Sequence, residues 1–343
     1  MASLAETYDV ALVDLDGVVY IGPGPVDHAA EALAKARADG MRLAFVTNNA
    51  ARPPRAVAEH LSRLGIAVSS DEVVTSAQAA ARVLADMLPK GASVLVVGGE
   101  GLVAALQERG LRPVSDLAGD PLAVVQGFHP DVGWRQLAEG SYAVAAGLPW
   151  VASNTDRTLP TPRGTAPGNG TLVDAIRAAT GRAPTVAGKP EPPMHREAVL
   201  RSGARRPLVV GDRLDTDIEG ARRVGADSLL VLTGVTDPVG LVRAPAAQRP
   251  TYVGSDLRAL RESADAVTVL AGLARCGGAS AVVEGGQLVV RLSRGHDTTA
   301  KLDVLRAVCG AAWAVGDPVT VDGVETVLAE AGWTVHPSTE GPY

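Results

Sequence analysis

The sequence predicts an α/β fold built around a parallel sheet, and three observations support this prediction. Short, continuously apolar runs at residues 10–13, 42–46 and 207–210 have the length of strands that are buried on both faces. Helical patterns follow some of these runs, such as residues 29–40, which end in glycine. Polar clusters come directly after the apolar runs, where the carboxyl ends of parallel strands hold reactive groups.

Length and composition limit the classes of function. A chain of 343 residues is long enough for two domains and an appended unit. The net charge of −6 argues against a nucleic-acid or membrane-surface partner, and no apolar run approaches the roughly 18 residues of a transmembrane helix. The chain start lacks the pattern of a secretory signal. Its two cysteines, Cys276 and Cys309, suit neither a disulfide framework nor a zinc cluster, so we expect a cytoplasmic protein.

The alternation of patterns divides the chain into a core, an insert and an appendage. We assign residues 1–79 and 187–262 to the core and residues 80–186 to a second α/β unit inserted into it. The insert has predicted strands at 93–97, 122–126 and 142–145, and it ends in a Pro/Gly-rich loop at 159–170. Residues 265–343 form a small α+β appendage. Its Gly285-Gly286 pair predicts a hairpin turn between strands 281–284 and 287–292, with helices near 298–308 and 324–331.

Acidic side chains follow two of the apolar runs. Asp14 and Asp16 come just after the first run, and Gly17 allows a sharp turn there. Two carboxylates this close repel each other unless a cation or a proton lies between them, and Mg²⁺ prefers oxygen ligands. Asp212 follows the run at 207–210, and Asp217 opens the next helical stretch, where it could orient Asp212 or a metal-bound water. A solvated loop is the simpler alternative for an isolated Asp-x-Asp-Gly.

Two further motifs have side chains suited to a phosphate group. Thr47 and Asn48 follow the run at 42–46, and a hydroxyl with backbone amides at such a turn can bind phosphate oxygens. Taken alone, this motif is better explained by helix capping. Lys189 lies between Gly188 and Pro190, which restrict its backbone, so its ammonium group could neutralise a phosphoryl group or a carboxylate pair.

Together, these motifs resemble the haloacid dehalogenase (HAD) superfamily over about residues 8–260. The matching motifs, in the family's order, are Asp14-Leu15-Asp16-Gly17, Thr47-Asn48, Lys189 and Gly211-Asp212 through Asp217. An α/β insert of about 100 residues between Thr47 and Lys189 is similar to the C2 cap of the group that contains NagD-like, phosphoglycolate, glycerol-3-phosphate and 4-nitrophenyl phosphatases. The resemblance implies a Rossmann-like HAD core with an inserted C2 cap.

The same resemblance implies a role for each matching residue. Asp14 would be the nucleophile that forms an aspartyl-phosphate, and Asp16 would be the general acid and base. Mg²⁺ would be bound by Asp14, Asp16 and Asp212, with Asp217 supporting this site. The phosphoryl group would be bound by Thr47, Asn48 and Lys189. The expected function is a Mg²⁺-dependent phosphatase for a small phosphorylated metabolite, although these motifs do not separate a phosphatase from a phosphotransferase.

The expected specificity depends on a loop of the insert that contains Asn154, Asp156, Arg157 and Leu159. Similar pyridoxal-phosphate phosphatases have a histidine where this chain has Leu159, which favours a small aliphatic leaving group. Glycerol 3-phosphate and 2-phosphoglycolate are therefore the preferred substrates. The alternatives are that Leu159 only packs the loop, that the substrate is a nucleotide or pyridoxal phosphate, or that the protein is a non-catalytic phosphate-binding module. A homodimer could form through the cap or the appendage.

One motif points to a different class of enzyme. Gly99, Gly101 and Ala104 match the pattern G-x-G-x-x-A after the apolar run at 93–97, which is typical of a dinucleotide site. No complete two-half dinucleotide-binding layout surrounds this motif. A packing role for these glycines at a strand–helix turn is the favoured interpretation.

Overall fold

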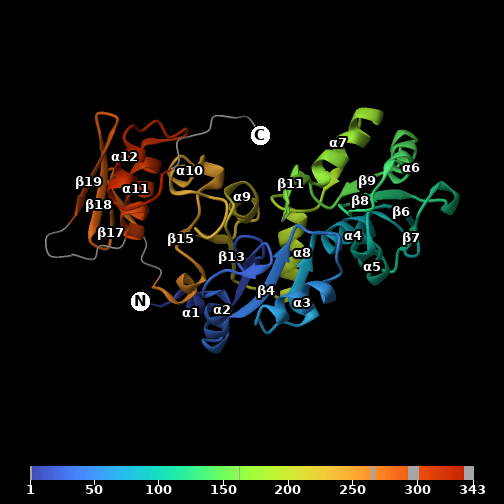
Figure 1. The fold of residues 1–343 in the computed structure, drawn as a ribbon, viewed down its shortest axis with the longest axis horizontal. Coiled ribbons are helices and arrows are strands. Elements are labelled where there is room, and N and C mark those ends of the chain that lie inside the picture. The colour runs from blue at the N-terminus through green and yellow to red at the C-terminus, as the bar shows by residue number, and fades with distance from the viewer. Residues whose placement is uncertain (1, 162, 264–266, 293–300, 336–343) are drawn as a thin grey trace.

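The computed structural model describes residues 2–161, 163–263, 267–292 and 301–335 of the chain. Three units lie in a row, each built on its own main sheet, with the insert at one end, the core in the middle and the C-terminal unit at the other end (Figure 1). Within the described residues, no helix is both long and apolar enough to cross a membrane.

The core sheet has six parallel strands in the order β15-β14-β13-β1-β4-β5. Their bounds are β1 Val10–Asp14, β4 Arg42–Thr47, β5 Val73–Thr75, β13 Pro207–Gly211, β14 Asp227–Val231 and β15 Tyr252–Gly254. The central strand β1 pairs with β13 on one side and with β4 on the other. Residues far apart in the sequence therefore meet at the carboxyl ends of these three strands.

Both faces of this sheet are covered, which explains why its strands are continuously apolar. Ala11 and Val13 of β1 belong to a buried cluster with helices α2 (Ala29–Ala38) and α3 (Pro54–Arg63). Val10 and Leu12 belong to a second cluster with α8 (Pro192–Ser202) and α9 (Glu219–Arg223). Shorter core elements are α1 Leu4–Thr7, the hairpin β2 Tyr20–Ile21 and β3 Gly24–Pro25, η1 Ser70–Glu72, η3 Leu214–Ile218, α10 Pro238–Val242, η4 Ala246–Gln248 and η5 Leu257–Arg261.

The insert contains a second parallel sheet, in the order β12-β9-β8-β6-β7. Its strands are β6 Ser93–Val97, β7 Arg112–Val114, β8 Ala123–Gln126, β9 Trp150–Ala152 and β12 Thr185–Val186. Its helices are α5 Glu100–Glu108, α6 Trp134–Ala145 and α7 Asn169–Thr180, together with the 3-10 turn η2 Leu117–Gly119. The predicted Pro/Gly-rich loop contains a hairpin, β10 Thr158–Thr161 and β11 Gly164–Pro167.

The strand predicted at residues 142–145 is wrong, because these residues form the last turn of α6. Ala143 and Val144 are fully buried against the insert sheet, whereas Tyr142 is 56% exposed. A four-residue apolar run of this kind fits one face of a helix as well as a buried strand, so periodicity could not separate the two.

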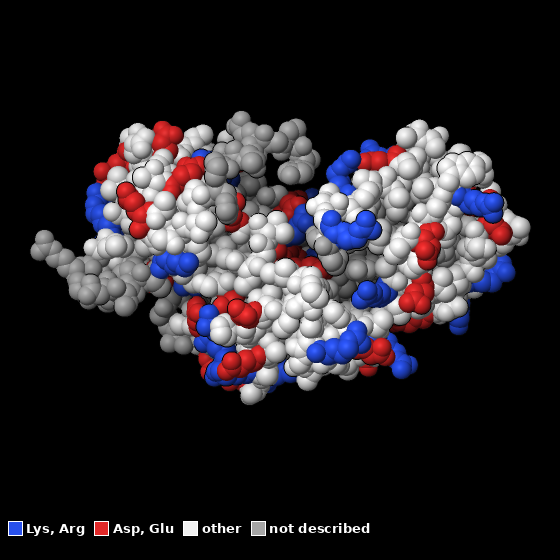
Figure 2. Space-filling view, viewed as in Figure 1, with Lys and Arg blue, Asp and Glu red and all other residues white. Residues whose placement is uncertain are grey.

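The insert and the core share a buried interface. Helix α4 (Ser76–Met87) runs without a break across the predicted boundary at 79/80, and its residues join the cluster that packs against α8. Glu197 of α8 has a fully buried side chain and accepts hydrogen bonds from Arg82, Arg109 and Arg201. In Figure 2 a hollow lined partly by acidic and basic side chains separates the insert from the rest of the molecule.

The C-terminal unit is a four-stranded antiparallel sheet covered by helices. Its elements are β16 Thr268–Leu270, β17 Leu273–Cys276, β18 Ala279–Glu284, β19 Gln287–Leu292, α11 Lys301–Val315 and α12 Val324–Glu330. Gly285 and Gly286 have φ values of 59° and 84°, which confirms the predicted hairpin turn. Both predicted helices are present, but α11 continues to Val315. Residues 298–300 of the prediction lie outside the described residues.

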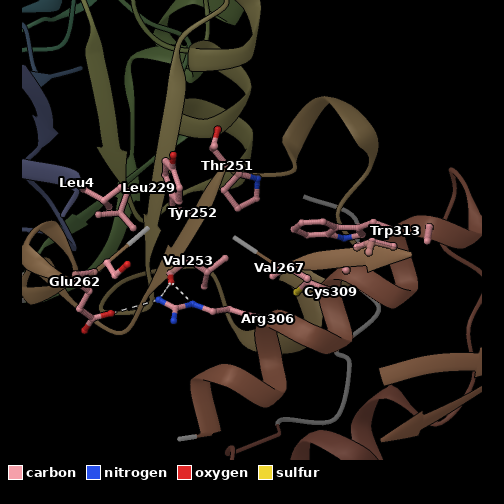
Figure 3. A pocket seen from close by; sticks show the side chains of 16 residues that line it. Leu4, Leu229, Thr251, Tyr252, Val253, Glu262, Val267, Arg306, Cys309 and Trp313 are labelled. Atoms are coloured by element: carbon pink, nitrogen blue, oxygen red, sulfur yellow. Dashed lines mark hydrogen bonds and ion pairs between the residues drawn. The ribbon is translucent and has the colours of Figure 1, made fainter. Parts of the chain in front are cut away.

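This unit is packed against the edge strand of the core sheet. One buried cluster contains Leu230 and Val253 of the core together with Leu305 and Val308 of α11. Arg306 donates two hydrogen bonds to the carbonyl of Val253, as Figure 3 shows, beside a cavity of about 460 Å³. The sheet edge at β15 is thus covered rather than left open for pairing with another chain.

We expect Glu197→Ala to destabilise the protein by about 3 kcal/mol, because it leaves three arginines without their buried counter-ion. Urea denaturation would measure the loss. The control is Glu59→Ala, which removes the exposed pair with Arg55 and should cost less than about 0.5 kcal/mol. If the two variants lost the same free energy of unfolding, the buried cluster would contribute no more to holding the insert on the core than an exposed ion pair does.

Candidate active site

The predicted polar residues meet at the carboxyl end of the core sheet. Asp14 is the last residue of β1, Thr47 is the last residue of β4, and Asp212 directly follows β13. These residues, together with Asp16 and Lys189, line one cavity of about 360 Å³. The parallel strand order thus brings together motifs that are up to 198 positions apart in the sequence (Asp14 and Asp212).

Lys189 lies at the centre of the acidic cluster. Its Nζ is 2.5 Å from Asp14 Oδ1 and 2.7 Å from Asp217 Oδ1, and all three side chains are nearly or fully buried. Asp217 belongs to the short π-helical segment η3, one turn ahead of α9, where we had predicted a regular helix. A side chain at Gly211 would collide with Asp217, which explains the glycine at that position.

Asp212 has one satisfied and one unsatisfied carboxylate oxygen. Its Oδ2 accepts a hydrogen bond of 2.7 Å from the backbone amide of Val235. Its Oδ1 is buried and has no hydrogen-bond partner among the described residues. Gly17 and Gly234 lie so close that a Cβ on either would collide with this carboxylate, and Gly17 has a φ of 82°. The glycines therefore keep space around Asp212.

Burial and nearby carboxylates raise the pKa values of Asp14 and Asp212. Burial raises the pKa of Asp14 well above its usual value, Lys189 lowers it in part, and Asp217 and Asp212 raise it further. Burial, followed by Asp217, raises the pKa of Asp212 to about 6. Burial alone would lower the pKa of Lys189, but the adjacent Asp14 and Asp217 raise it overall. The cluster therefore has more acidic groups than one lysine can neutralise.

This donor set fits a divalent cation. Ligand atoms of Asp14, Asp212 and Asp217 all lie within 4.8 Å of one another. The unpartnered Oδ1 of Asp212 is a hard oxygen donor of the kind that Mg²⁺ prefers. Both carboxylate oxygens of Asp217 are engaged, one by Lys189 and the other by the backbone amide of Arg213, whereas Lys189 contacts only Oδ1 of Asp14, so Asp14 and Asp212 are the better candidates for direct ligands.

The side chain of Asn48, which lines the cavity, forms hydrogen bonds with neighbouring protein groups. Its Oδ1 accepts a hydrogen bond from the backbone amide of Lys189, and its Nδ2 donates to the carbonyl of Lys189 and to Asp156. The polar atoms of its side chain are thus engaged by protein groups, and its phosphate contact stays a prediction. Thr47 remains suited to phosphate binding, because its hydroxyl accepts from the amide of Asn49 and can still donate.

The insert brings three of its four predicted specificity residues to the cavity. Asn154, Asp156 and Leu159 line it, and Asn154 also donates to the carbonyl of Asn48. Burial raises the pKa of Asp156, and its hydrogen bond from Asn48 lowers it in part. Arg157 is not among the residues that line the cavity. Its side chain is 66% exposed and pairs with Asp174 of α7 at 2.8 Å.

Among the cavity residues without a role assigned from the sequence, Tyr20 and Arg213 have side chains that contact acidic residues. Tyr20 donates from its hydroxyl to Asp16 Oδ2 at 3.4 Å, and Arg213 forms a two-pronged contact with Asp215 at the cavity wall. The sequence did offer a signal for Arg213, because this basic residue lies between Asp212 and Asp215 in the chain. Tyr20 gave no such signal, because its contact with Asp16 depends on the turn that Gly17 allows.

The glycines that suggested a dinucleotide site have packing roles. A Cβ on Gly101 would lie 2.2 Å from the carbonyl oxygen of Ala50, and one on Gly99 would collide with His129. Gly101, in the first turn of α5, lets this helix approach the core chain closely. The arrangement supports the packing interpretation of the motif.

The fold and the site define a class of protein: a parallel α/β hydrolase with an acidic, lysine-balanced centre. Family models described as haloacid dehalogenase-like hydrolase and HAD-hydrolase-like match residues 11–112 and 186–260. The chain belongs to the haloacid dehalogenase-like hydrolase family.

The comparisons also identify individual relatives. A D-glycerol 3-phosphate phosphatase from Mycobacterium tuberculosis is 46% identical over 317 residues, which are 91% of this chain and 88% of that protein. A 5′-nucleotidase from Bacillus subtilis is 36% identical and covers 67% of this chain and 90% of its own length.

Solved structures extend the likeness to the C-terminal unit. The structure of glycerol phosphate phosphatase from Mycobacterium tuberculosis with magnesium has a TM-score of 0.86 and 44% identity, covering 96% of this chain and 99% of that chain. The p-nitrophenyl phosphatase of Archaeoglobus fulgidus has a TM-score of 0.68 and 32% identity, covering 74% of this chain and 98% of that chain. The first match therefore includes most of the C-terminal unit.

We expect Mg²⁺ to raise the melting temperature, and to raise it more near pH 7.5 than near pH 5.5. Asp212, whose pKa is raised to about 6, loses its proton across this range. Because the raised pKa belongs to the folded state, the metal-free protein loses stability as the pH rises through it, and a bound cation offsets this loss. Scanning calorimetry with and without Mg²⁺ would measure the shift.

Asp212→Asn should abolish this Mg²⁺-dependent shift. The exposed Asp215, replaced as Asp215→Asn, provides the control and should keep it. A shift that is equal at both pH values, or that survives Asp212→Asn, would place the metal elsewhere.

Proposed function

We propose that this chain is a Mg²⁺-dependent phosphatase that hydrolyses a small phosphomonoester, with glycerol 3-phosphate as the preferred substrate. The observation that carries this proposal is the convergence of Asp14, Lys189 and Asp212 in one buried cavity. A bound Mg²⁺, held by Asp14, the Asp16 backbone carbonyl and Asp212, would supply charge neutralisation at the phosphoryl oxygens.

Asp14 and Asp16 divide the chemistry between them. Lys189 binds Oδ1 of Asp14 and leaves Oδ2 to form a bond to phosphorus, as the P–O bond to the alcohol breaks. Asp16 lies at the accessible mouth of the same cavity, and burial by its surroundings raises its pKa, which suits a group that protonates the leaving alcohol. The same carboxylate then takes a proton from the water that hydrolyses the aspartyl-phosphate, so Asp14 is regenerated.

The groups that bind the phosphoryl moiety supply charge balance and position. Lys189 and the hydroxyl of Thr47 face the cavity and can donate to phosphoryl oxygens. Asp217 holds Lys189 from the opposite side, which fixes the ammonium group before substrate binds. Asn48 fixes the Lys189 backbone through two hydrogen bonds, so it contributes to phosphate binding through position.

The preference for glycerol 3-phosphate rests on the cavity and on the relatives. A volume of about 360 Å³ suits a small substrate, and Leu159 offers an apolar wall where an aromatic ring would need a polar partner. Asp156 and Asn154 place polar atoms on the same side, where they can bind the hydroxyls of a polyol. The name of the relative from Mycobacterium tuberculosis agrees with this substrate. A nucleotide is the second candidate, because another relative is named a 5′-nucleotidase.

Three sequence-based predictions are kept as proposals. The first is the division into a core (1–79 and 187–262), a cap (80–186) and an appendage (265–343). The second is a homodimer formed through the cap or the appendage, supported by the exposed Trp134 and Tyr142 on α6. The third is a cytoplasmic location, supported by the two free, buried cysteines.

Asp14→Asn and Asp16→Asn should separate the two catalytic roles. We expect Asp14→Asn to lose phosphate release from every ester, because no aspartyl-phosphate can form. Asp16→Asn should lower kcat for glycerol 3-phosphate by about 100-fold or more. With 4-nitrophenyl phosphate, the first-turnover release of 4-nitrophenol should fall at most about tenfold, because this leaving group needs little protonation, whereas later turnovers slow because hydrolysis of the aspartyl-phosphate has lost its base.

The control for this pair is Asp86→Asn on the exposed side of α4, which should keep full activity. If Asp14→Asn kept phosphate release, the assignment of the nucleophile would be wrong. If the first turnover slowed equally with both substrates in Asp16→Asn, this residue would not be the acid.

A substrate panel tests the preference. We expect kcat/KM to be highest for glycerol 3-phosphate among glycerol 3-phosphate, 2-phosphoglycolate, pyridoxal phosphate and UMP. Leu159→His should raise the ratio of pyridoxal phosphate to glycerol 3-phosphate activity by about tenfold, because it adds a polar partner for the ring. A higher kcat/KM for UMP or pyridoxal phosphate in the wild type would refute the preference.

A further inference from the structure

A second concave site lies between helices α8 and α9 on the face of the core sheet. This α8–α9 groove has a volume of about 790 Å³, and none of its lining residues also lines the catalytic cavity. Leu12 of β1 and Val209 of β13 form its buried floor, and Val199, Leu200 and Val224 add more accessible apolar surface at the two helices. The groove therefore offers an apolar bed large enough for a small organic molecule.

Arginines without counter-ions border the same groove. Arg196, Arg205 and Arg206 are exposed, and their side chains have no ion-pair partner within the described ranges of the chain. Arg206 lies over the ring of Tyr8, 5.5 Å from its centroid, which orients its guanidinium group. In a protein of net charge −6, three free arginines at one hollow are an unusual local excess of positive charge.

The acidic groups near these arginines are already engaged. Asp227, the one carboxylate among the described residues that line the groove, accepts hydrogen bonds from the hydroxyls of Tyr8 and Thr251. Asp9 accepts the backbone amides of residues 205 and 206 and the side chain of Arg42. Arg223 also lines the groove, but it is paired with Glu191 and Glu219. The positive charge of the three free arginines therefore remains available to a ligand.

His195 supplies an independent sign that the groove takes a ligand. Its side chain lines the groove and is 1% exposed, and neither ring nitrogen has a hydrogen-bond partner among the described residues. Burial, followed by the nearby Lys189, lowers the pKa of His195 to about 4, so the ring is neutral with one donor and one acceptor. Buried polar groups are nearly always hydrogen-bonded, so a histidine left unpaired here calls for a partner.

We infer that the α8–α9 groove is a second ligand site, which binds a small organic phosphate that has an apolar body. The arginines would hold the phosphoryl group, because planar guanidinium groups match its oxygens. The apolar body would lie on Val199, Leu200 and Val224, above the floor formed by Leu12 and Val209, and a polar atom of the ligand would be directed towards His195. This second site is separate from the catalytic cavity, where the phosphoryl group of the substrate would react with Asp14.

Calorimetric titration of the Mg²⁺-loaded protein with phenylphosphonate tests this inference. This probe has a phenyl ring and a phosphonate group, and its P–C bond is not an ester. We expect two equivalents to bind to the wild type, one in the catalytic cavity and one in the groove. The double variant Arg196→Gln/Arg205→Gln should weaken the second site by about tenfold or more, because it removes two of the three free charges.

The matched control is Arg135→Gln/Arg275→Gln, which removes two exposed arginines elsewhere and should keep both sites. If the wild type bound a single equivalent and the Arg196/Arg205 double variant still bound it, the inference would be overturned. A single equivalent that is lost in this variant would support the groove and count instead against phosphate binding at the catalytic cavity. Inorganic phosphate should bind the groove about tenfold more weakly than phenylphosphonate, because it buries no ring, and equal affinity would overturn the apolar contact.

Discussion

The buried contact of Lys189 with Asp14 and Asp217 is the interaction on which this site depends. Three carboxylates of the cluster lie within 4.8 Å of one another, and their mutual repulsion in a buried setting would be costly without a cation. Lys189 offsets part of this cost and leaves a net negative centre, which is the state that a divalent metal completes. The strand order β13-β1-β4 brings the carboxyl ends of these strands side by side, and this sets the distances between the groups of the site.

Hydrogen bonds connect the insert to this centre. Asn48 joins the end of β4 to the Lys189 backbone and to Asp156 of the insert, and Asn154 closes the link by donating to the Asn48 carbonyl. Asp156 of the insert and the backbone of Lys189 are therefore held by the same hydrogen-bonded residue, Asn48. A second, ionic link at Glu197 holds the insert from its far side.

The C-terminal unit packs against the segment that contains Asp217. Its buried cluster contains Leu305 and Val308 of α11 and also Ile218, the residue after Asp217. The π-helical segment that carries Asp217 thus rests on a core shared with this unit. The solved structure from Mycobacterium tuberculosis has the same arrangement over 96% of this chain, whereas the p-nitrophenyl phosphatase match covers 74%.

The sequence by itself determined the parallel core sheet and the residues of the acidic centre, because buried strands have continuously apolar runs and their reactive groups follow directly after them. It also determined the hairpin at Gly285, where two positive φ values are needed. It could not place residues 142–145, since four apolar residues fit a helix face or a strand equally well. The tertiary structure alone decided that the Asn48 side chain bonds Lys189 and Asp156 and that Arg157 turns to Asp174. Such pairings join residues far apart in the chain, and local patterns do not encode which distant partner a polar side chain meets.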